Sequence, residues 1–423
     1  MANISSSNSL GEDVPKLRFP DTKGNFFTDY THNTLRGLFT RITQRNTEGI
    51  TNVITNSAEH GLIPQRDFFD KDIAVDGNTS NYYVIKPGDF VYNPRKSNQA
   101  PYGPFNCYNY MDEGIVSPLY TCLRPQIKEY TEFLLWYFKS PVWHSYIYHT
   151  GAQGGARHDR VGMTTELMEG IPINLPEINE QQKIVSFLNL IERKINIQCK
   201  LVECLKLYKR GLLAKLFPQK GESVPRYRFE GFTDDWEQRK AADIAEYSKG
   251  NGYSKSDLTE VGTPIILYGR LYTKYQFAID EVDTFVTPKN GAVYSQGNEV
   301  IIPASGETAE DIARASAVGK PGVLLGGDLN ILRPFNYINP LFLALAISSG
   351  EPQKELAKKA QGKSVVHIHN SDIQEVSVLY PTRAEQDQIV AIFRKLDHLI
   401  TLHQNRSKIL KKIKDGLLQN LFI

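Results

Sequence analysis

The chain carries Gly11-Glu-Asp-Val-Pro15-Lys-Leu-Arg18-Phe19 and repeats it 210 residues later as Gly221-Glu-Ser-Val-Pro225-Arg-Tyr-Arg228-Phe229. Further pairs follow in the same order. At a shift of 209, Gly88-Asp-Phe-Val91 matches Gly297-Asn-Glu-Val300, and Leu123-Arg124-Pro125 matches Leu332-Arg333-Pro334. At a shift of 205, Pro176 matches Pro381, Glu180-Gln181 matches Glu385-Gln386, and Ile184-Val185 matches Ile389-Val390. Solenoid repeats run to about 20 to 50 residues, so each copy here is a folded domain with an appendage. Two similar units predict a pseudo-twofold molecule, which suits a two-part target.

Composition places the chain among ordinary globular proteins. Its 423 residues allow two or three domains, with 41% hydrophobic and 23% charged residues. The sequence contains neither a membrane-length apolar stretch nor a signal-peptide pattern, which favours a cytoplasmic protein without membrane contact. The four cysteines lack zinc-motif spacing and are interpreted as reduced structural thiols. A net charge of +2 neither demands nor excludes nucleic acid.

Each appendage has the heptad pattern of a helix of about forty residues, hence about 60 Å long. The apolar seams are Ile184, Leu188, Ile191, Ile195, Val202, Leu205, Leu212 and Leu216 in the first copy, and Ile389, Phe393, Leu396, Ile400, Leu410, Leu417 and Leu421 in the second. Prolines precede both helices, and Thr382-Arg-Ala-Glu385 reads as a capping box. A helix this long needs a partner for its seam, so the two are predicted to pack on each other as an antiparallel coiled coil.

Polar residues interrupt both seams at corresponding places. Gln198 corresponds to His403, and Lys209 corresponds to Lys414. These positions are either tolerated and partly exposed, or they fix the register of the two helices at some cost in stability.

The globular parts mix short β-like runs with helices, and the predicted fold class is α+β. Expected strands include 82–85, 89–92, 264–268 and 300–302, and expected helices cover 133–138 and 341–347, with Asn339-Pro340 as a helix start. The predicted domains are 1–175, with 1–10 as a loose tail, and 219–380. The predicted long helices are 176–218 and 381–423.

Motifs of nucleic-acid enzymes are missing from the sequence. It contains no Gly-x-x-x-x-Gly-Lys-Ser/Thr phosphate loop, no amino-methyltransferase loop and no His-Glu-x-x-His metal motif. His367-x-His369 is better explained as a strand pair than as half of a metal site. We therefore assign no catalytic and no metal-binding residue to this chain.

The order and duplication of these motifs resemble those of the specificity subunit of type I restriction-modification systems. The resemblance rests on the Val-Pro-x-x-Arg-Phe openings, on helices that begin with Pro-x-x-x-Glu-Gln and end with Gly-Leu-Leu-x-x-Leu-Phe, and on the Gly88-Asp-Phe-Val91 and Gly114–Tyr120 segments. It covers the chain from Gly11 to Phe422. One departure is Asn298, which replaces the aspartate of the Gly-Asp pair in the second copy and puts a turn hydrogen bond in doubt.

The resemblance implies two target recognition domains, each reading one half of an asymmetric bipartite DNA sequence, with the helices as spacer and docking platform. It implies double-stranded DNA, two modification (methyltransferase) subunits and restriction/translocase subunits as partners. It also implies that S-adenosylmethionine, ATP and Mg bind those partner subunits, so that this chain holds no cofactor.

Chemistry nominates the DNA contacts, because charged groups suit phosphate, and amides and guanidinium groups suit base edges. The candidates in the first domain are Arg95, Lys96, Ser97, Asn98, Gln99, Arg157, His158 and Arg160, with Arg36, Arg41 and Arg45 as backbone contacts. The candidates in the second domain are Lys249, Tyr253, Lys255, Arg270, Tyr272, Lys274, Ser305, Gly306, Lys363 and Ser364. Each of these residues also has an alternative interpretation as part of a solvated turn.

Two other functions compete with this one. The chain could be a fused methyltransferase or nuclease with an unrecognised catalytic site, which binding of S-adenosylmethionine would support. It could also be a two-domain scaffold that binds protein, which the modest net charge favours. Salt-dependent affinity for duplex DNA separates the scaffold from the DNA-binding subunit.

Overall fold

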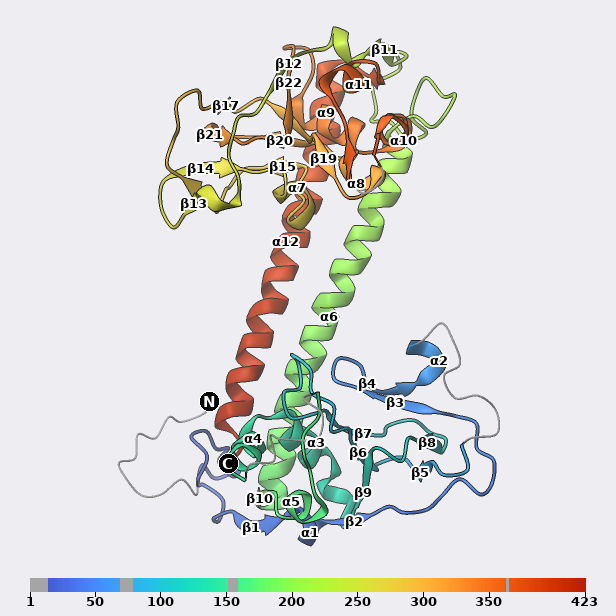
Figure 1. The fold of residues 1–423 in the computed structure, drawn as a ribbon, viewed down its shortest axis with the longest axis vertical. Helices are drawn as coiled ribbons and strands as arrows, with labels where there is room; N and C mark the ends of the chain where they lie inside the picture. Colours follow the sequence, from blue (N-terminus) through green and yellow to red (C-terminus); the bar gives the residue numbers. More distant parts are fainter. Residues whose placement is uncertain (1–13, 69–78, 151–158, 363–364) are drawn as a thin grey trace. The chain divides into compact units, whose positions relative to one another are not determined.

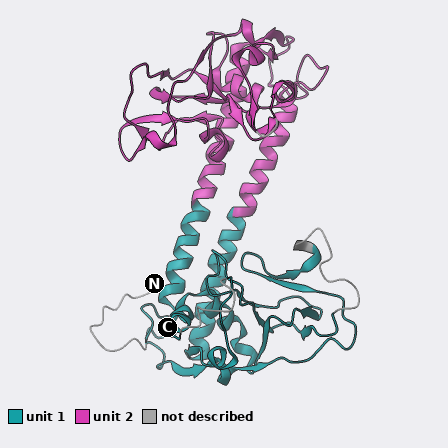
Figure 2. Ribbon diagram, in the orientation of Figure 1, with its two compact units in different colours: residues 1–198, 406–423 teal, residues 199–405 magenta. Residues whose placement is uncertain are grey.

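A computed structural model describes residues 14–68, 79–150, 159–362 and 365–423 (Figure 1). The chain divides into two compact units, coloured separately in Figure 2. Unit 1 comprises residues 1–198 and 406–423, and unit 2 comprises residues 199–405. Each unit therefore contains one globular part, the beginning of one long helix and the end of the other.

The core of unit 1 forms around an antiparallel four-stranded sheet. Its order is β2 (Phe39–Arg41), β9 (Thr121–Pro125), β6 (Phe90–Tyr92) and β7 (Phe105–Cys107). Helices α3 (Thr131–Lys139) and α4 (Val142–His149) supply aromatic side chains to this core. The rings of Phe105 and Phe138 stack with centroids 3.8 Å apart, and Trp143 is buried beside them. Burial of these large rings stabilises the unit.

Smaller elements surround this sheet. Three two-stranded sheets pair β1 (Thr31–Thr34) with β10 (Pro172–Leu175), β3 (Ile54–Ser57) with β4 (Gly61–Pro64), and β5 (Tyr83–Ile85) with β8 (Gly114–Val116). The short helices are α1 (Leu35–Leu38), α2 (Gln65–Phe68), η1 (Lys128–Tyr130) and α5 (Thr165–Glu169).

Unit 2 has two five-stranded sheets. The first has the order β12 (Ala245–Lys249), β22 (Leu329–Pro334), β18 (Val300–Pro303), β20 (Ser316–Val318) and β15 (Ala278–Ile279). The second has the order β13 (Leu258–Thr259), β16 (Phe285–Val286), β14 (Thr263–Ile266), β21 (Pro321–Leu325) and β17 (Tyr294–Gln296). Two pairs complete the strands: β11 (Glu237–Lys240) with β24 (Ser377–Tyr380), and β19 (Ser305–Gly306) with β23 (Val366–His367).

Helices of unit 2 connect its strands. They are η2 (Ala241–Asp243), η3 (Lys255–Asp257), α7 (Arg270–Thr273), α8 (Ala309–Ile312), α9 (Pro340–Ile347), α10 (Gly350–Lys359) and α11 (Asn370–Gln374). One of them, α9, packs on β18, β20 and β22 of the first sheet. Helix α9 is almost entirely buried, and the Asn339 side chain caps it by accepting from the backbone N–H groups of Leu341 and Phe342. This confirms Asn339-Pro340 as a helix start.

The two units share one strand order. In unit 1, β9 lies between β2 and β6, and in unit 2, β22 lies between β12 and β18, with antiparallel pairing throughout. Phe90 pairs with Leu123, and Val300 pairs with Leu332. Since Leu123 and Leu332 are counterparts, Phe90 corresponds to Val300. The sequence alignment of Val91 with Val300 is therefore wrong by one residue, because Asn298 is an extra residue in the turn of unit 2.

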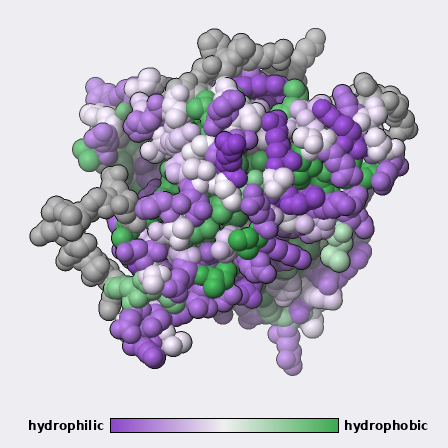
Figure 3. Space-filling model, turned by 90° about the horizontal axis from the view of Figure 1, so that it is seen from below, coloured by the Kyte–Doolittle hydropathy of each residue, from purple (hydrophilic) through white to green (hydrophobic). Residues whose placement is uncertain are grey.

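Two long helices run through the chain, α6 (Ile178–Leu216) and α12 (Arg383–Asn420). Their apolar seam residues are buried near the globular parts: Ile184 and Leu188 lie in the core of unit 1, and Ile389 and Phe393 lie in the core of unit 2. No helix within the described ranges combines the length and the apolar character that crossing a bilayer requires. The face of the molecule in Figure 3 is mostly polar, with apolar side chains in small patches.

Candidate nucleic-acid interface

The first candidate loop of unit 1 leaves the end of β6. The Asn93 side chain accepts from the backbone N–H of Arg95 at 3.0 Å, which turns the chain out of the sheet. Arg95, Ser97, Asn98 and Gln99 are exposed, and Lys96 is half-buried. This loop, which we call the β6 loop (Asn93–Pro104), presents two cations and several amide or hydroxyl groups to solvent, a combination that fits phosphate and base edges.

The structure brings the second candidate segment of unit 1 to the same place. The backbone N–H of Lys96 donates to the carbonyl of Asp159 at 2.8 Å, and that of Val161 donates to Pro94 at 2.9 Å. The Arg95 guanidinium lies 3.9 Å from the Asp159 carboxylate. The Nε atom of Arg160 is buried without a hydrogen-bond partner. Arg157 and His158 lie outside the described residues.

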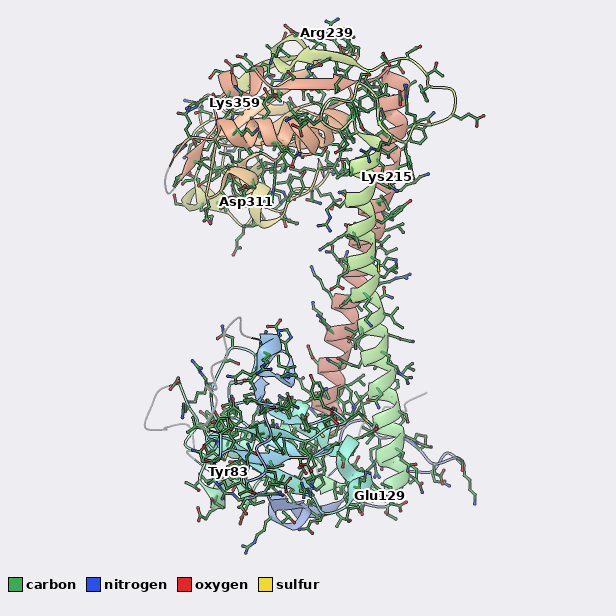
Figure 4. The ribbon with its side chains drawn as sticks, turned by 90° about the vertical axis from the view of Figure 1, so that its right-hand side faces the viewer. Tyr83, Glu129, Lys215, Arg239, Asp311 and Lys359 are labelled. Atoms are coloured by element: carbon green, nitrogen blue, oxygen red, sulfur yellow. The ribbon has the colours of Figure 1, made fainter. Side chains whose placement is uncertain are left out.

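The three arginines nominated for DNA-backbone contacts in unit 1 bind other parts of the protein instead. Arg36 lies 3.8 Å from Glu169, and Arg41 donates to the Thr165 hydroxyl at 2.9 Å. The Arg45 guanidinium stacks on the ring of Tyr83, which is labelled in Figure 4, with its central carbon 4.2 Å from the ring centroid. These contacts attach α1 and β2 to α5, and the segment after β2 to β5.

In unit 2, the segment after β12 is an exposed turn with two lysines. We call it the β12 loop (Lys249–Lys255). A Cβ on Gly250 would lie 1.9 Å from the carbonyl oxygen of Gly326, so only glycine fits there. The Asn251 side chain donates to the carbonyl of Gly291 at 2.8 Å. Lys249 and Lys255 are exposed, as expected of DNA contacts.

Tyr253 lies in the same loop but is 9% exposed. Its ring packs with Ile265, Val286 and Leu324, and its hydroxyl accepts from the backbone N–H of Lys289 at 2.7 Å. The Tyr253 ring therefore anchors the loop and is not presented to a base.

The candidates Arg270, Tyr272 and Lys274 also bind other residues of the protein. The Arg270 side chain is 8% exposed and lies 2.5 Å from Asp283, which also accepts from Lys274 at 2.6 Å. The hydrogen bonds from Lys274 and Arg270 lower the pKa of Asp283 to about 2. The Tyr272 hydroxyl donates to the carbonyl of Ser305. Arg270 and Lys274 attach α7 to the segment between β15 and β16, and Tyr272 attaches it to β19. Of the three, only Lys274 remains well exposed.

The segment after β18 has a structural role in its first residues. Ser305 and Gly306 form β19, and the Ser305 hydroxyl lies 3.1 Å from Nδ1 of His367 on β23. Gly306 is buried, and a Cβ there would lie 2.8 Å from the Tyr272 hydroxyl. His367 therefore lies in a strand, as predicted, whereas His369 lies outside that strand and caps helix α11. Lys363 and Ser364 lie outside the described residues.

The duplicated sequence motifs form the same ion pair in both units, which sequence reasoning did not recognise. In unit 1, Arg18 donates to both oxygens of Glu180, at 3.1 and 2.7 Å. In unit 2, Arg228 donates to both oxygens of Glu385, at 3.0 and 2.7 Å. Both carboxylates are buried. The carboxylate that the sequence assigned to a capping box is therefore used by Arg228, and the recurrence of Arg and Glu in both motifs was the signal for this pair.

A second ion pair also recurs. Asp89 accepts from Nε and Nη2 of Arg124, both at 2.7 Å, and from the backbone N–H of Lys86. In unit 2, Glu299 accepts from Arg333 at 3.3 Å and from the backbone N–H groups of residues 296–298. The turn hydrogen bond that Asn298 put in doubt is thus made by Glu299, one residue later. The preceding glycines, Gly88 and Gly297, both have φ of 91°, where L side chains are strained.

Metal and thiol chemistry is not evident at these surfaces. Among the residues that the structure describes, no group of three or more His, Cys, Asp or Glu side chains could hold a metal ion. Cys107 and Cys122 are buried thiols, and burial raises the pKa of each to about 12, which keeps them protonated and unreactive.

Comparison with known proteins identifies the second half of the chain. Residues 233–412 match the model of the type I restriction modification DNA specificity domain family. This segment is therefore similar to a type I restriction modification DNA specificity domain. It contains the β12 loop, both sheets of unit 2 and most of α12.

A curated relative has a name that matches this family. The chain is 22% identical over 268 residues to the type I restriction enzyme MjaVIII specificity subunit of Methanocaldococcus jannaschii, in an alignment that covers 60% of this chain and 62% of the relative. The chain thus spans less than two thirds of that relative's length.

Two solved structures share the fold. One is the S subunit of a type I restriction-modification system from M. genitalium, with a TM-score of 0.56, 16% identity, and coverage of 97% of this chain and 99% of that one. The other comes from a study of complex assembly and conformational transition of the type I restriction-modification system, with a TM-score of 0.56, 16% identity, and coverage of 93% and 97%. Because both alignments cover nearly the whole chain, the fold likeness includes unit 1.

Proposed function

We propose that this chain is the DNA sequence-specificity subunit of a type I restriction-modification complex, in which each unit reads one half of a bipartite target. The observation that carries this proposal is the shared strand order of the two units, combined with the DNA specificity domain in residues 233–412. A fold that reads DNA in one half of a chain and recurs in the other half suits two half-sites.

We further propose that residues 1–175 and 219–380 are the two target recognition domains and that residues 176–218 and 381–423 form an antiparallel coiled coil with a pseudo-twofold axis. Two ion pairs support this arrangement. Lys414 donates to Glu192 at 2.9 Å within unit 1, and Lys209 donates to Asp397 at 2.5 Å within unit 2. These two pairs are each other's counterparts at a shift of 205. The lysines that interrupt the heptads therefore have anionic partners on the other helix.

In this proposal, the methyltransferase, translocase and nuclease activities belong to partner subunits. Two modification subunits would dock on the helical platform, one for each half of the pseudo-dyad, and would carry S-adenosylmethionine. Restriction subunits would carry ATP and Mg. Support comes from the sequence, which lacks the phosphate-binding and methyltransferase loops that this chemistry uses.

Methylome sequencing of the host with and without the gene tests the proposal. Deletion should remove one bipartite methylated motif, and a plasmid copy should restore it. As a control, a copy in which residues 11–175 are exchanged for those of a relative should change one half of the motif only. An unchanged methylome after deletion, in a host that expresses the modification subunit, would contradict the proposal.

A further inference from the structure

Each unit has its own copy of the sheet, and the two copies carry different charges at the equivalent end. Strands β2 and β6 both run antiparallel to β9, so both end where β9 begins. Strands β12 and β18 likewise both end where β22 begins. Each unit therefore presents two loops side by side at this end, one after the edge strand and one after the central strand.

Backbone hydrogen bonds confirm that the two loops of unit 2 are neighbours. The N–H of Gly250, which follows β12, donates to the carbonyl of Leu329 at 3.0 Å. The N–H of Ala304, which follows β18, donates to the carbonyl of Asp328 at 2.7 Å. Asp328 and Leu329 are consecutive residues at the start of β22, so DNA that approaches this end can meet either loop.

The loop after the central strand changes sign between the units. In unit 1, the β6 loop (Asn93–Pro104) contains Arg95 and Lys96 and no carboxylate of its own. Asp159 of the neighbouring segment lies 3.9 Å from Arg95, whose side chain stays 71% exposed. In unit 2, the corresponding segment, the β18 loop (Ala304–Ala315), contains three carboxylates and one arginine. That arginine, Arg314, lies 2.5 Å from Asp311, which is labelled in Figure 4. Exposed Glu307 and Glu310 remain, and they would repel phosphate.

The loop after the edge strand shows the opposite pattern. In unit 2, the β12 loop carries Lys249 and Lys255 and no carboxylate. In unit 1, the corresponding residues 43–49 contain one arginine and one glutamate, and that arginine, Arg45, is stacked on Tyr83. The side chain of Asn46 in this segment is buried and bonds to the backbone of Ile50.

The β12 loop also has the rigid shape that base reading requires. Asn251 is held by its bond to Gly291, and Lys289 in that neighbouring turn lies over the Tyr253 ring at 5.1 Å and pairs with Asp257 at 2.5 Å. An anchored asparagine offers an amide that can pair with adenine, and the open Cβ position of Gly252 allows close approach of the backbone.

We propose that the two units contact DNA through different loops at the same end of the same sheet: unit 1 through the β6 loop, with Arg95 and Lys96, and unit 2 through the β12 loop, with Lys249, Asn251 and Lys255. The β18 loop of unit 2 makes no phosphate contact. This inference rests on the proposed function and assigns the specificity-determining loop of each unit.

The salt dependence of DNA binding tests the assignment. The full chain, assembled with its modification subunits, is titrated with a 40-base-pair duplex of mixed sequence at several salt concentrations. Each phosphate contact contributes about 0.9 to the slope of log affinity against log salt, so K249A/K255A and R95A/K96A should each reduce that slope by about 2. The matched control, E307Q/E310Q, removes two charges from the neighbouring loop and should leave the slope unchanged.

Base reading is tested by methylome sequencing of a host that carries the Asn251→Ala variant. The substitution should relax the base specificity of one half of the methylated motif and leave the other half unchanged. If K249A/K255A assembles poorly, K249Q/K255Q keeps the polar side chains and serves in the same titration.

The outcomes separate this inference from the proposed function. A wild-type complex without salt-dependent affinity for any duplex would contradict both. If R95A/K96A reduces the slope of log affinity against log salt but K249A/K255A leaves it unchanged, the loop assignment alone would be overturned. An increase in affinity of about tenfold or more for E307Q/E310Q would also overturn it, because that result requires phosphates close to the β18 loop.

Discussion

Unit 1 and unit 2 have the same framework ion pairs but different charges at the end of their sheets. Arg18 with Glu180 and Arg228 with Glu385 are made by the same atoms at nearly the same distances. In contrast, the loop after the central strand is basic in unit 1 and acidic in unit 2. The duplicated contacts hold the fold, and the differing loops are free to specify two different half-sites, as expected of a chain that reads an asymmetric target.

The largest expected effect comes from breaking the shared framework. Arg18→Ala leaves the buried Glu180 carboxylate without its partner, and Arg228→Ala does the same to Glu385. Removal of one partner from a buried pair costs about 3 to 5 kcal/mol, so each variant should lose stability by that amount. Guanidinium denaturation monitored by circular dichroism measures the loss. Arg226→Ala, which removes an exposed pair with Glu222, serves as the control. Unequal losses at Arg18 and Arg228 would show that the two frameworks are not equivalent.

A second test uses the pH dependence of unit 1. His144 packs against Trp143 and against Tyr102 of the β6 loop, with centroids 4.6 and 4.9 Å away. Burial lowers the pKa of His144 to about 4. Between pH 6.5 and 4, the unfolded chain binds a proton that the folded chain does not, so stability is complete above pH 6.5 and falls as the pH decreases. At pH 5, the expected loss is about 1 to 2 kcal/mol.

In unit 2, the corresponding β18 loop is attached by a hydrogen bond to a serine. The N–H of Ala315 donates to the Ser348 hydroxyl at 2.8 Å, and this contact does not titrate. Thermal melting at pH 7.5 and pH 5 should therefore show a loss in the wild type that His144→Gln reduces. His149→Gln, at an exposed position on the same helix, is the control. The same pH dependence in the wild type and in His144→Gln would contradict the explanation.

The helix ion pairs should have smaller and equal effects. The Lys209–Asp397 side chains are 19% and 30% exposed, and those of Lys414–Glu192 are 22% and 32% exposed. Partly buried pairs of this kind couple by about 0.5 to 1 kcal/mol. Double-mutant cycles with Lys209→Met and Asp397→Asn in unit 2, and with Lys414→Met and Glu192→Gln in unit 1, measure both couplings. Coupling in one unit only would contradict the proposed symmetry of the helices.

Local signals in the sequence predicted much of the framework. The heptads predicted helices close to α6 and α12, and the apolar runs predicted β6, β14, β18 and α9, because periodicity and flanking Gly or Pro are properties of short segments. The strand order could not be predicted, because it depends on contacts between distant residues such as Phe90 and Leu123. For the same reason, the sequence did not show that Arg18 and Glu180, which are 162 positions apart, form an ion pair.

The candidate site divides in the same way. The sequence nominated Lys249, Lys255 and Arg95 because cations in Gly- or Asn-rich turns are a local signal, and the structure shows that all three are exposed. The pairing of Asp283 with Arg270 and Lys274 and the burial of Tyr253 could not be predicted, because both depend on tertiary packing. The extra residue Asn298 also shifts the sequence alignment by one, because strand register makes Phe90, and not Val91, the counterpart of Val300.

The smallest effect on stability is expected from a change in the length of the helices, which tests whether they set the distance between the half-sites. If α6 and α12 pack antiparallel as proposed, the ion pairs of both units place Lys200 opposite Arg406. A seven-residue insertion after Lys200 and another after Asn405 therefore lengthen both helices at one level. Seven residues preserve the heptad and add about 10 Å at 1.5 Å per residue. Because base pairs are 3.4 Å apart, the unread spacer should lengthen by about three base pairs, with both half-sites unchanged.

The spacer prediction has a matched control in a two-residue insertion at the same positions. That insertion rotates the seam by about 200° and should damage folding, whereas the heptad insertion should leave the melting temperature nearly unchanged. Methylome sequencing then compares the spacers directly. A heptad variant that remains active with its original spacer would show that the distance between the half-sites is fixed by another part of the complex, and the duplicated helices would then be a docking platform alone.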